Sequence, residues 1–183
     1  QDLTENIDFC AMTPLQVENS LDKIHFIRKL IIGGAAVSEP LKEKIFAELE
    51  RQEARNGKQE SGRKHPAPST QHPSFNYHHS TTIYETYGMS ETISHIALKE
   101  LWPFTQDYFS TLAGISISTD ERGCLTIFAP ELLAEPIQTN DLVEITAEDE
   151  FRFLGRTDNV INSGGAKIFP EILEAFIKKQ DRK

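Results

Sequence analysis

Two helices are predicted by the spacing of apolar positions and by the residues that precede them. Thr13 is followed by Pro14 and, three positions on, by Gln16, which is the pattern of a capping box with proline in the first helical position. A short helix is expected to start there. Ser38 is a candidate N-cap for a second helix, and the apolar residues behind it recur at every fourth position, which predicts one buried face. These residues are Leu41, Ile45 and Leu49.

Extended segments are predicted where β-branched and aromatic residues run together or alternate with polar ones. The stretch "RKLIIGGAA" indicates a buried strand that enters a turn, and "TTIYETYG" a core strand that ends at Gly88. "ISISTDERGCLTIFAP" and "DLVEITAEDEFRFLGR" each place a polar turn between two apolar runs, so each predicts a hairpin. Pro170 then opens a third helix, "PEILEAFIKK". This order of elements favours a mixed α/β fold.

Residues 51–80 interrupt this pattern. They are rich in proline, serine, glutamine and asparagine and carry few large apolar side chains, so they bury too little surface to offset the entropy of ordering. We expect a mobile surface insertion. Four histidines lie in it or at its end and make a metal site the minor alternative, because their spacing is irregular and no cysteine or carboxylate pattern accompanies them.

Composition limits the classes of function. The formal net charge of -9 argues against a general nucleic-acid binder, because phosphate contacts require clustered lysine and arginine. No stretch approaches the length of a membrane span and the start lacks a leader pattern, so a cytoplasmic location is expected. Cys10 and Cys124 lie far apart without a CxxC pattern and are interpreted as buried thiols.

Two loops rich in small and polar residues are candidate ligand contacts. Gly33, Gly34 and Ala35 follow a predicted strand, where small side chains let the backbone approach a flat ligand; tight packing of strand against helix explains them equally well. In "YETYGMSETISH", the Tyr87 ring can cover a nucleobase, and the hydroxyl and carboxylate that follow can serve phosphate and magnesium. The alternative is a core tyrosine and a helix-capping serine.

A third candidate lies at the last predicted hairpin. Asp141 heads one of its strands, where a carboxylate can accept hydrogen bonds from both hydroxyls of a ribose. Arg156 ends the other strand, and the hairpin can bring the two side chains to the same end. The alternative is a turn residue and a surface ion pair.

The order of these motifs resembles the adenylate-forming superfamily, which contains acyl-CoA ligases, luciferases and peptide-synthetase adenylation domains. The resemblance rests on a small-residue turn, then "YGMSE", then "TND", then "GRTDNVINSGGAKIFPEILE". Within the superfamily, "YGMSETISHIAL" and "NVINSGGAKIFPEILE" are most similar to the o-succinylbenzoate-CoA ligases of menaquinone biosynthesis. The resemblance covers almost the whole chain outside the insertion.

The resemblance implies a role for each matching residue. The nucleotide would contact Gly33, Gly34, Ala35, Tyr87, Gly88, Asp141 and Arg156, with the Tyr87 ring on adenine and the Asp141 carboxylate on ribose. Ser90 would contact the α-phosphate and Glu91 would serve magnesium, both as catalytic residues. His95 would border the acyl pocket, and Asp158 would be the hinge of a small C-terminal domain. Two positions depart from the family pattern: Ser90 replaces threonine, and Asn140 replaces the glycine of "TGD".

The implied reaction joins a small-molecule carboxylic acid to coenzyme A with ATP and Mg²⁺, by way of an acyl-adenylate. The resemblance implies the later part of a large α/β domain with β hairpins in residues 1–157, and the hinge and start of a small domain in 158–183. The family's phosphate loop is not found before Gly33, and its adenylating lysine would lie beyond Lys183, so we expect the isolated chain to be inactive. Alternatives are a ligase for another aryl or fatty acid and a non-catalytic nucleotide-binding module; an oligomer is compatible with either.

Overall fold

The computed structural model describes residues 6–60, 81–159, 161–163 and 166–168, together with Pro170 and Ile177. The chain forms two compact units. The first comprises Gln1–Glu85 and Leu101–Phe104, and the second comprises Thr86–Glu100 and Thr105–Lys183. The predicted domain boundary before Asp158 falls within the second unit and stays a prediction, because most of the segment after it lies outside the described residues.

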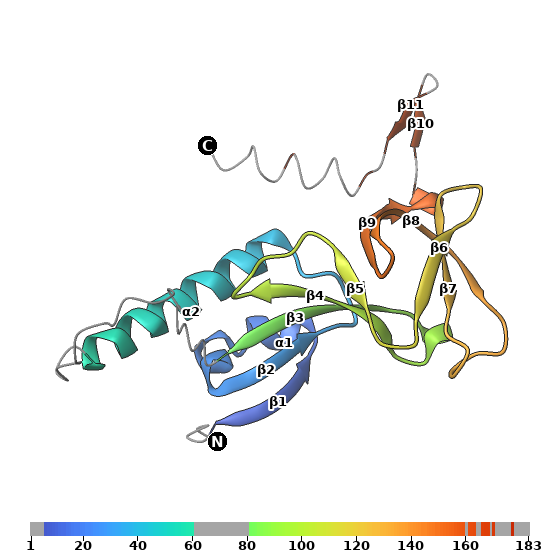
Figure 1. Cartoon of the computed structure of the whole chain (residues 1–183). Coiled ribbons are helices and arrows are strands. Elements are labelled where there is room, and N and C mark those ends of the chain that lie inside the picture. The colour runs from blue at the N-terminus through green and yellow to red at the C-terminus, as the bar shows by residue number, and fades with distance from the viewer. Residues whose placement is uncertain are drawn as a thin grey trace, which may run out of the picture. The chain divides into compact units, whose positions relative to one another are not determined.

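The first unit is built from parallel strands and helices (Figure 1). Strand β1 pairs in parallel with β2, and β2 with the first half of β3. The elements are β1 (Ile7–Met12), α1 (Pro14–Glu18), η1 (Leu21–Phe26), β2 (Ile27–Ile32), α2 (Glu39–Glu60) and β3 (Thr82–Gly88). Strand β3 begins in this unit and ends in the second, and β4 (His95–Trp102) runs back from the second unit into the first.

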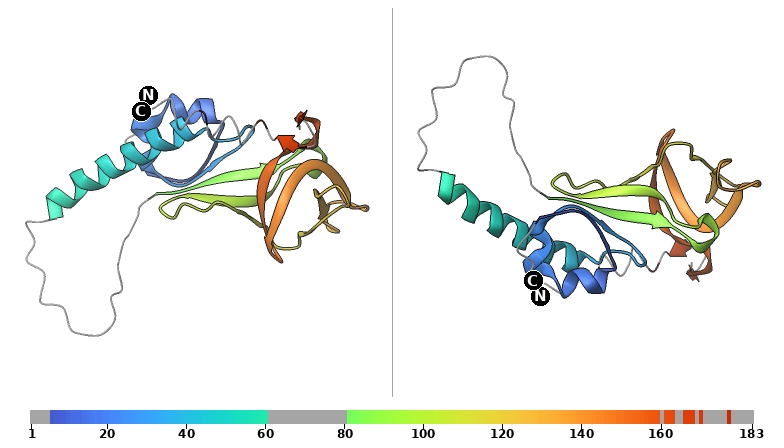
Figure 2. Two further views of the ribbon diagram at one scale, coloured as in Figure 1. Left: turned by 90° about the horizontal axis from the view of Figure 1, so that it is seen from above. Right: turned by 90° about the horizontal axis from the view of Figure 1, so that it is seen from below.

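Both predicted helices of this unit are present. At α1 the capping box is closed in both directions, because the Thr13 amide donates to Gln16 Oε1 over 2.8 Å and the Gln16 amide donates to Thr13 Oγ1 over 3.4 Å. Helix α2 begins directly after Ser38, and both views of Figure 2 show it running past the blue strands of the same unit. It continues to Glu60, so residues 51–60 of the predicted insertion are helical, and 61–80 lie outside the described residues.

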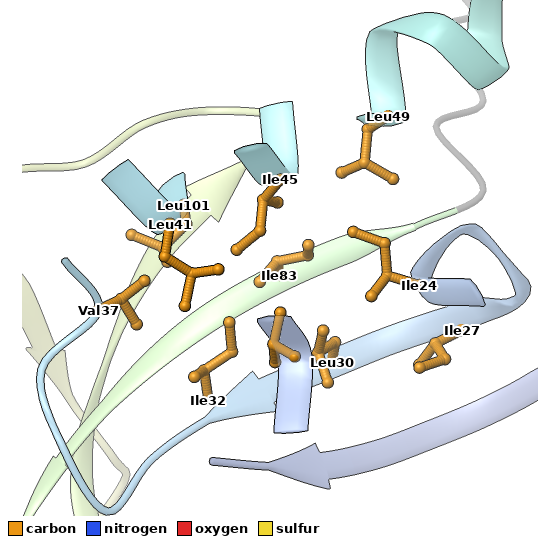
Figure 3. Close-up of a cluster of buried hydrophobic side chains, with 11 residues drawn as sticks. Ile24, Ile27, Leu30, Ile32, Val37, Leu41, Ile45, Leu49, Ile83 and Leu101 are labelled. Carbon is orange, nitrogen blue, oxygen red and sulfur yellow. The ribbon is translucent and has the colours of Figure 1, made fainter. Parts of the chain in front are cut away.

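The apolar face of α2 completes the core of the first unit. Its side chains meet those of η1, β2, β3 and the end of β4 (Figure 3). The most deeply buried members have no exposed surface and are Val17, Ile24, Leu30, Ile32, Ile45, Ile83 and Leu101. The predicted stripe of every fourth residue is confirmed, since Leu41, Ile45 and Leu49 are at most 5 % exposed.

The second unit is antiparallel. The pairs are β4 with β5, β5 with β9, β9 with β8, β8 with β7, and β7 with β6. The further elements are η2 (Ser90–Thr92), β5 (Phe109–Thr111), β6 (Ser116–Thr119), β7 (Cys124–Phe128), β8 (Ile137–Ala147), β9 (Glu150–Arg156), η3 (Thr157–Asn159), β10 (Ile161–Ser163) and β11 (Ala166–Ile168). Both predicted hairpins are confirmed, as β6–β7 and β8–β9, and β10 pairs with β11. The orange strands β8 and β9 are strongly curved (Figure 2).

Neither cysteine forms a disulfide within the described residues. Cys124 is buried, as predicted, whereas Cys10 is only partly buried at the margin of the first core. The second core includes Ile96, Phe109 and Phe151. No helix among residues 6–60 and 81–159 is long and apolar enough to cross a membrane.

Replacing Ile45 with alanine should lower the free energy of unfolding by about 3 kcal/mol, because the fully buried side chain would leave a cavity in the first core. Urea unfolding of the purified chain measures this. Glu50→Ala, at an exposed position of the same helix, is the matched control and should change stability by less than about 0.5 kcal/mol. Equal effects of the two changes would contradict the assigned packing of α2.

Candidate functional site

The candidate site of the second unit is organised around a bond between the end of β3 and the middle of β8. The Tyr87 hydroxyl donates to Asp141 Oδ2 over 2.6 Å. The Tyr87 ring lies edge-on to Phe151, with 5.0 Å between centroids, and it also packs against Phe109 and Phe153. Both the ring and the hydroxyl of Tyr87 are therefore fixed in position before any ligand arrives.

This environment keeps the Tyr87 phenol protonated. Burial disfavours its ionised form most, and the hydrogen bond and the negative charge of Asp141 act in the same direction, so the pKa of Tyr87 is raised far above its ordinary value. Tyr87 is therefore a permanent hydrogen-bond donor to the carboxylate near neutral pH.

Arg156 contacts the same carboxylate from the neighbouring strand. Asp141 and Arg156 face each other directly in the β8–β9 ladder, and Arg156 Nε lies 3.5 Å from Asp141 Oδ1. The carboxylate side chain is 14 % exposed and that of arginine 53 %. The hairpin thus brings a nearly buried acceptor and a solvent-accessible donor to one place, the pair of groups that a ribose phosphate requires.

The loop between β3 and β4 holds the predicted phosphate and magnesium contacts. Ser90 and Glu91 form the exposed part of the turn η2. The buried Thr92 fastens this turn, because its hydroxyl exchanges hydrogen bonds with the backbone of Met89 and reaches the carbonyl of Ser94 over 2.7 Å. The candidate side chains are therefore presented on a fixed backbone.

Ile93 occupies a strained conformation in this loop. Its φ of 64° and ψ of −38°, with a 2.6 Å bond from the Ser94 amide to the Thr92 carbonyl, define a tight turn that β-branched residues rarely adopt. Its side chain is also 76 % exposed. Strain and an exposed large apolar group at one residue are typical of functional loops. No pattern in the sequence indicates a role for Ile93.

Gly88 is required by close packing. A Cβ atom at Gly88 would lie 2.6 Å from His95 Cα and 2.6 Å from the Ser94 carbonyl oxygen, both of them backbone atoms. Glycine therefore lets the end of β3 pass the start of β4. His95 lies at that start, and its Nδ1 is 3.2 Å from the Ser94 hydroxyl oxygen.

The small-residue turn of the first unit has its own anchor. The Gly33 amide donates to the Met12 carbonyl over 3.0 Å, and Gly34 has a φ of +83°, which favours glycine. After Ala35 and Ala36 in the chain, the Val37 amide donates a hydrogen bond of 2.9 Å to the buried carboxylate of Glu85 in β3. Glu85 is not among the predicted site residues, although a carboxylate inside the apolar run "TTIYETYG" is a usable signal.

The described residues could bind a magnesium ion only together with the phosphates of a substrate. No group of three or more histidine, cysteine or acidic side chains among them could enclose a metal. Magnesium often keeps several waters and takes one or two carboxylates together with substrate phosphates. The exposed Glu91 carboxylate is compatible with that mode.

The comparisons with known proteins identify structures with a similar fold. No family model and no curated protein matches the chain. Among solved structures, an acyl-CoA synthetase (AMP-forming)/AMP-acid ligase II-like protein from Dyadobacter fermentans is 31 % identical, with a TM-score of 0.64 over 99 % of this chain and 46 % of that one. O-succinylbenzoate coenzyme A synthetase (MenE) from Bacillus subtilis, in complex with ATP and magnesium, has a TM-score of 0.64 at 16 % identity, over 95 % of this chain and 37 % of that one.

Coronafacic acid ligase from Pectobacterium brasiliense is similar to the same degree, with a TM-score of 0.60 at 16 % identity, over 93 % of this chain and 34 % of that one. The structural neighbours are thus adenylate-forming acyl-CoA synthetases, and the predicted resemblance is confirmed. The mixed α/β fold matches part of the large N-terminal domain of such enzymes. The chain spans less than half the length of these relatives.

Gly88→Ala should lower the free energy of unfolding by about 2 kcal/mol, because the new methyl group can be accommodated only if the backbone shifts. Chemical denaturation measures the loss. Gly114→Ala is the control: its Cβ would meet no atom within 4 Å, so only its φ of +83° contributes, at about 1 kcal/mol. A smaller loss at Gly88 than at Gly114 would contradict the close approach of β3 and β4.

Tyr87→Phe should lower the free energy of unfolding by about 1 kcal/mol at neutral pH, because the hydrogen bond to the Asp141 carboxylate is lost while the ring remains. Above pH ~10, the unfolded wild type releases the Tyr87 proton while the folded form retains it, so wild-type stability falls with rising pH. The phenylalanine variant lacks this loss, and the difference between the two proteins should shrink. Urea unfolding at pH 7 and in the alkaline range tests this; a constant difference would refute the raised pKa.

Proposed function

We propose that the full-length protein containing this chain ligates o-succinylbenzoate to coenzyme A, using ATP and Mg²⁺, through an acyl-adenylate. The observation that supports this most is the arrangement of Tyr87, Asp141 and Arg156 within one unit whose fold is that of acyl-CoA synthetases. The proposal of o-succinylbenzoate as the acid rests on the "YGMSETISH" and "NVINSGGAKIFPEILE" motifs. A cytoplasmic location remains part of the proposal.

In the first step, a carboxylate oxygen of the acid attacks the α-phosphorus of ATP and pyrophosphate leaves. Asp141 accepts the ribose hydroxyls, and the Tyr87 ring lies against adenine. Ser90 donates to an α-phosphate oxygen, where negative charge develops in the transition state. Glu91 would hold Mg²⁺, which neutralises phosphate charge when it is bound.

In the second step, the coenzyme A sulfur attacks the acyl carbon and AMP leaves. His95 borders the acyl group, and Asp158 is the pivot about which the small domain turns between the two steps. We expect no thioester formation by the 183-residue chain alone, because the phosphate loop and the adenylating lysine of the resemblance have no counterpart in it.

A ligase for another acid is the second candidate. Coronafacic acid ligase and MenE are both 16 % identical to the chain, so the two comparisons do not discriminate between acids. The ratio of kcat/KM values for o-succinylbenzoate and other aryl or fatty acids, measured with the full-length protein, separates these candidates. A preference of less than tenfold for o-succinylbenzoate would reject it as the dedicated substrate.

Asp141→Asn should weaken binding of a non-hydrolysable acyl-adenylate mimic about 10- to 100-fold, because an amide accepts the two ribose hydroxyls less well than a carboxylate does. Isothermal titration of the purified chain measures the Kd. Asp149→Asn, at the exposed turn between β8 and β9, removes the same charge and should leave the Kd unchanged. Equal affinities for wild type and Asp141→Asn would exclude the proposed ribose contact, and binding without catalysis by the full-length protein would favour the non-catalytic module.

A further inference from the structure

The carboxylate of Asp158 is held from two directions in the second unit. Arg156 Nη2 lies 3.3 Å from Asp158 Oδ2, and Asn140 Nδ2 lies 3.5 Å from the same oxygen. The adjacent Thr157 is also attached, because its hydroxyl donates to the Asn140 carbonyl over 3.2 Å. The turn η3 is therefore fastened to residue 140 of β8 by both the side chain and the backbone of that residue.

The orientation of the Asn140 amide is set by Arg122. Arg122 Nη1 donates to Asn140 Oδ1 over 3.0 Å. A guanidinium only donates and a carboxylate only accepts, so the amide oxygen must face Arg122 and the amide nitrogen must face Asp158. Arg122 thereby directs the donor of Asn140 toward the carboxylate.

Arg122 is itself rigidly placed. Its Nε and Nη2 each lie 2.8 Å from Asp120 Oδ2, and Nη2 donates to the Thr139 carbonyl over 3.0 Å. The Asp120 carboxylate also accepts the backbone amides of Arg122 and Cys124, and the bond from Cys124 contributes most to lowering the pKa of Asp120. Asp120 is thus a charged, fixed partner that prevents Arg122 from turning away.

Arg156 is shared between two carboxylates. One end of its guanidinium lies 3.5 Å from Asp141 Oδ1, and the other lies 3.3 Å from Asp158 Oδ2. A ribose phosphate that engages Arg156 competes directly for the contact to Asp158. The Asn140 amide is then the remaining side-chain contact of Asp158 among the described residues.

We propose that Arg122 and Asn140 are positioning residues for Asp158: a relay from Asp120 through Arg122 and Asn140 keeps the Asp158 carboxylate in place while Arg156 moves to the nucleotide. The inference rests on the proposed function for the roles of Arg156 and Asp158. It assigns a purpose to asparagine in "TND", where the resemblance leads one to expect glycine.

The amide at position 140 both accepts from Arg122 and donates to Asp158. Glycine has no side chain to bridge Arg122 and Asp158. Aspartate has nearly the same shape and would keep the bond from Arg122, but it would set a second carboxylate against Asp158. Asn140→Asp therefore removes the donor without changing the packing.

The test is amide hydrogen exchange of the purified chain, read from peptides that cover Thr157–Asn159. Asn140→Asp and Arg122→Gln should each accelerate exchange in this turn about fivefold, the effect expected when roughly 1 kcal/mol of local stabilisation is lost. The matched control is Arg152→Gln, which removes an arginine that bridges Asp107 and Glu144 and should leave the turn unchanged.

The double variant separates the relay from two independent contacts. Because both residues act through one bond to Asp158, combining Asn140→Ala, which introduces no second carboxylate, with Arg122→Gln should accelerate exchange no more than the stronger of those two single changes. Exchange in strand β4, which contains none of the substituted residues, serves as the internal reference for global stability. If exchange in the turn is accelerated no more than exchange in β4 in both single variants, or if the effects add, the relay is overturned.

A titration with AMP distinguishes failure of the relay from failure of the proposed nucleotide site. Added AMP should accelerate exchange of the turn in the wild type, and more strongly in Asn140→Asp, because Arg156 leaves Asp158. Acceleration by AMP that is the same in the wild type and in Asn140→Asp would count against the relay. Failure of the wild type to bind AMP would reject the proposed nucleotide site, whereas the exchange rates without AMP would still decide whether Arg122 and Asn140 hold Asp158.

Discussion

The candidate site depends on the hydrogen bond between Tyr87 and Asp141. It joins residues 54 positions apart, at the end of β3 and in the middle of β8, and the phenylalanine rings around Tyr87 leave its hydroxyl little freedom. Because Tyr87 is kept protonated and Asp141 is kept as its acceptor, the carboxylate has a fixed direction before a ligand binds. Arg156 then needs only the cross-strand register of β8 and β9 to reach the same group. A preorganised acceptor of this kind lowers the cost of ordering on binding.

Features that depend on nearby residues could be predicted from the sequence. The capping box at Thr13, the apolar stripe of α2 and the two hairpins all follow from spacing within one element or across one turn. The approach of Asp141 to Arg156 belongs to this class, because a hairpin register fixes both positions at once. Helix α2 extends ten residues into the predicted insertion, over "RQEARNGKQE". This segment is polar, which indicated a loop, but most of its residues are good helix formers, and their helix propensity favoured a helix.

Features that depend on distant backbone could not be predicted in the same way. Glycine is needed at position 88 because the backbone of Ser94 and His95 lies too close for a side chain. This close approach exists only in the folded structure, where the end of β3 passes the start of β4. Ile93 has a positive φ in the loop that the Thr92 hydroxyl closes by its bond to the Ser94 carbonyl, and no propensity indicates isoleucine there. The pairing of Tyr87 with Asp141 has no signal in local spacing either. The sequence patterns indicate two separate roles, Tyr87 on a nucleobase and Asp141 on a ribose, and do not pair the two residues.

In the proposed mechanism, ligand binding and hinge geometry use the same guanidinium. Arg156 is more than half exposed and lies between Asp141, which is nearly buried, and Asp158, which is largely exposed. Exposed ion pairs contribute little to stability, so the contact to Asp158 is weak enough for a phosphate to displace. The contact to Asp141 is 3.5 Å long and involves a carboxylate that also accepts the Tyr87 hydroxyl, so it does not trap Arg156 either. An arginine held weakly by two partners can transfer to a third at small cost, and this requires a second support for Asp158, which Asn140 and Arg122 are placed to provide.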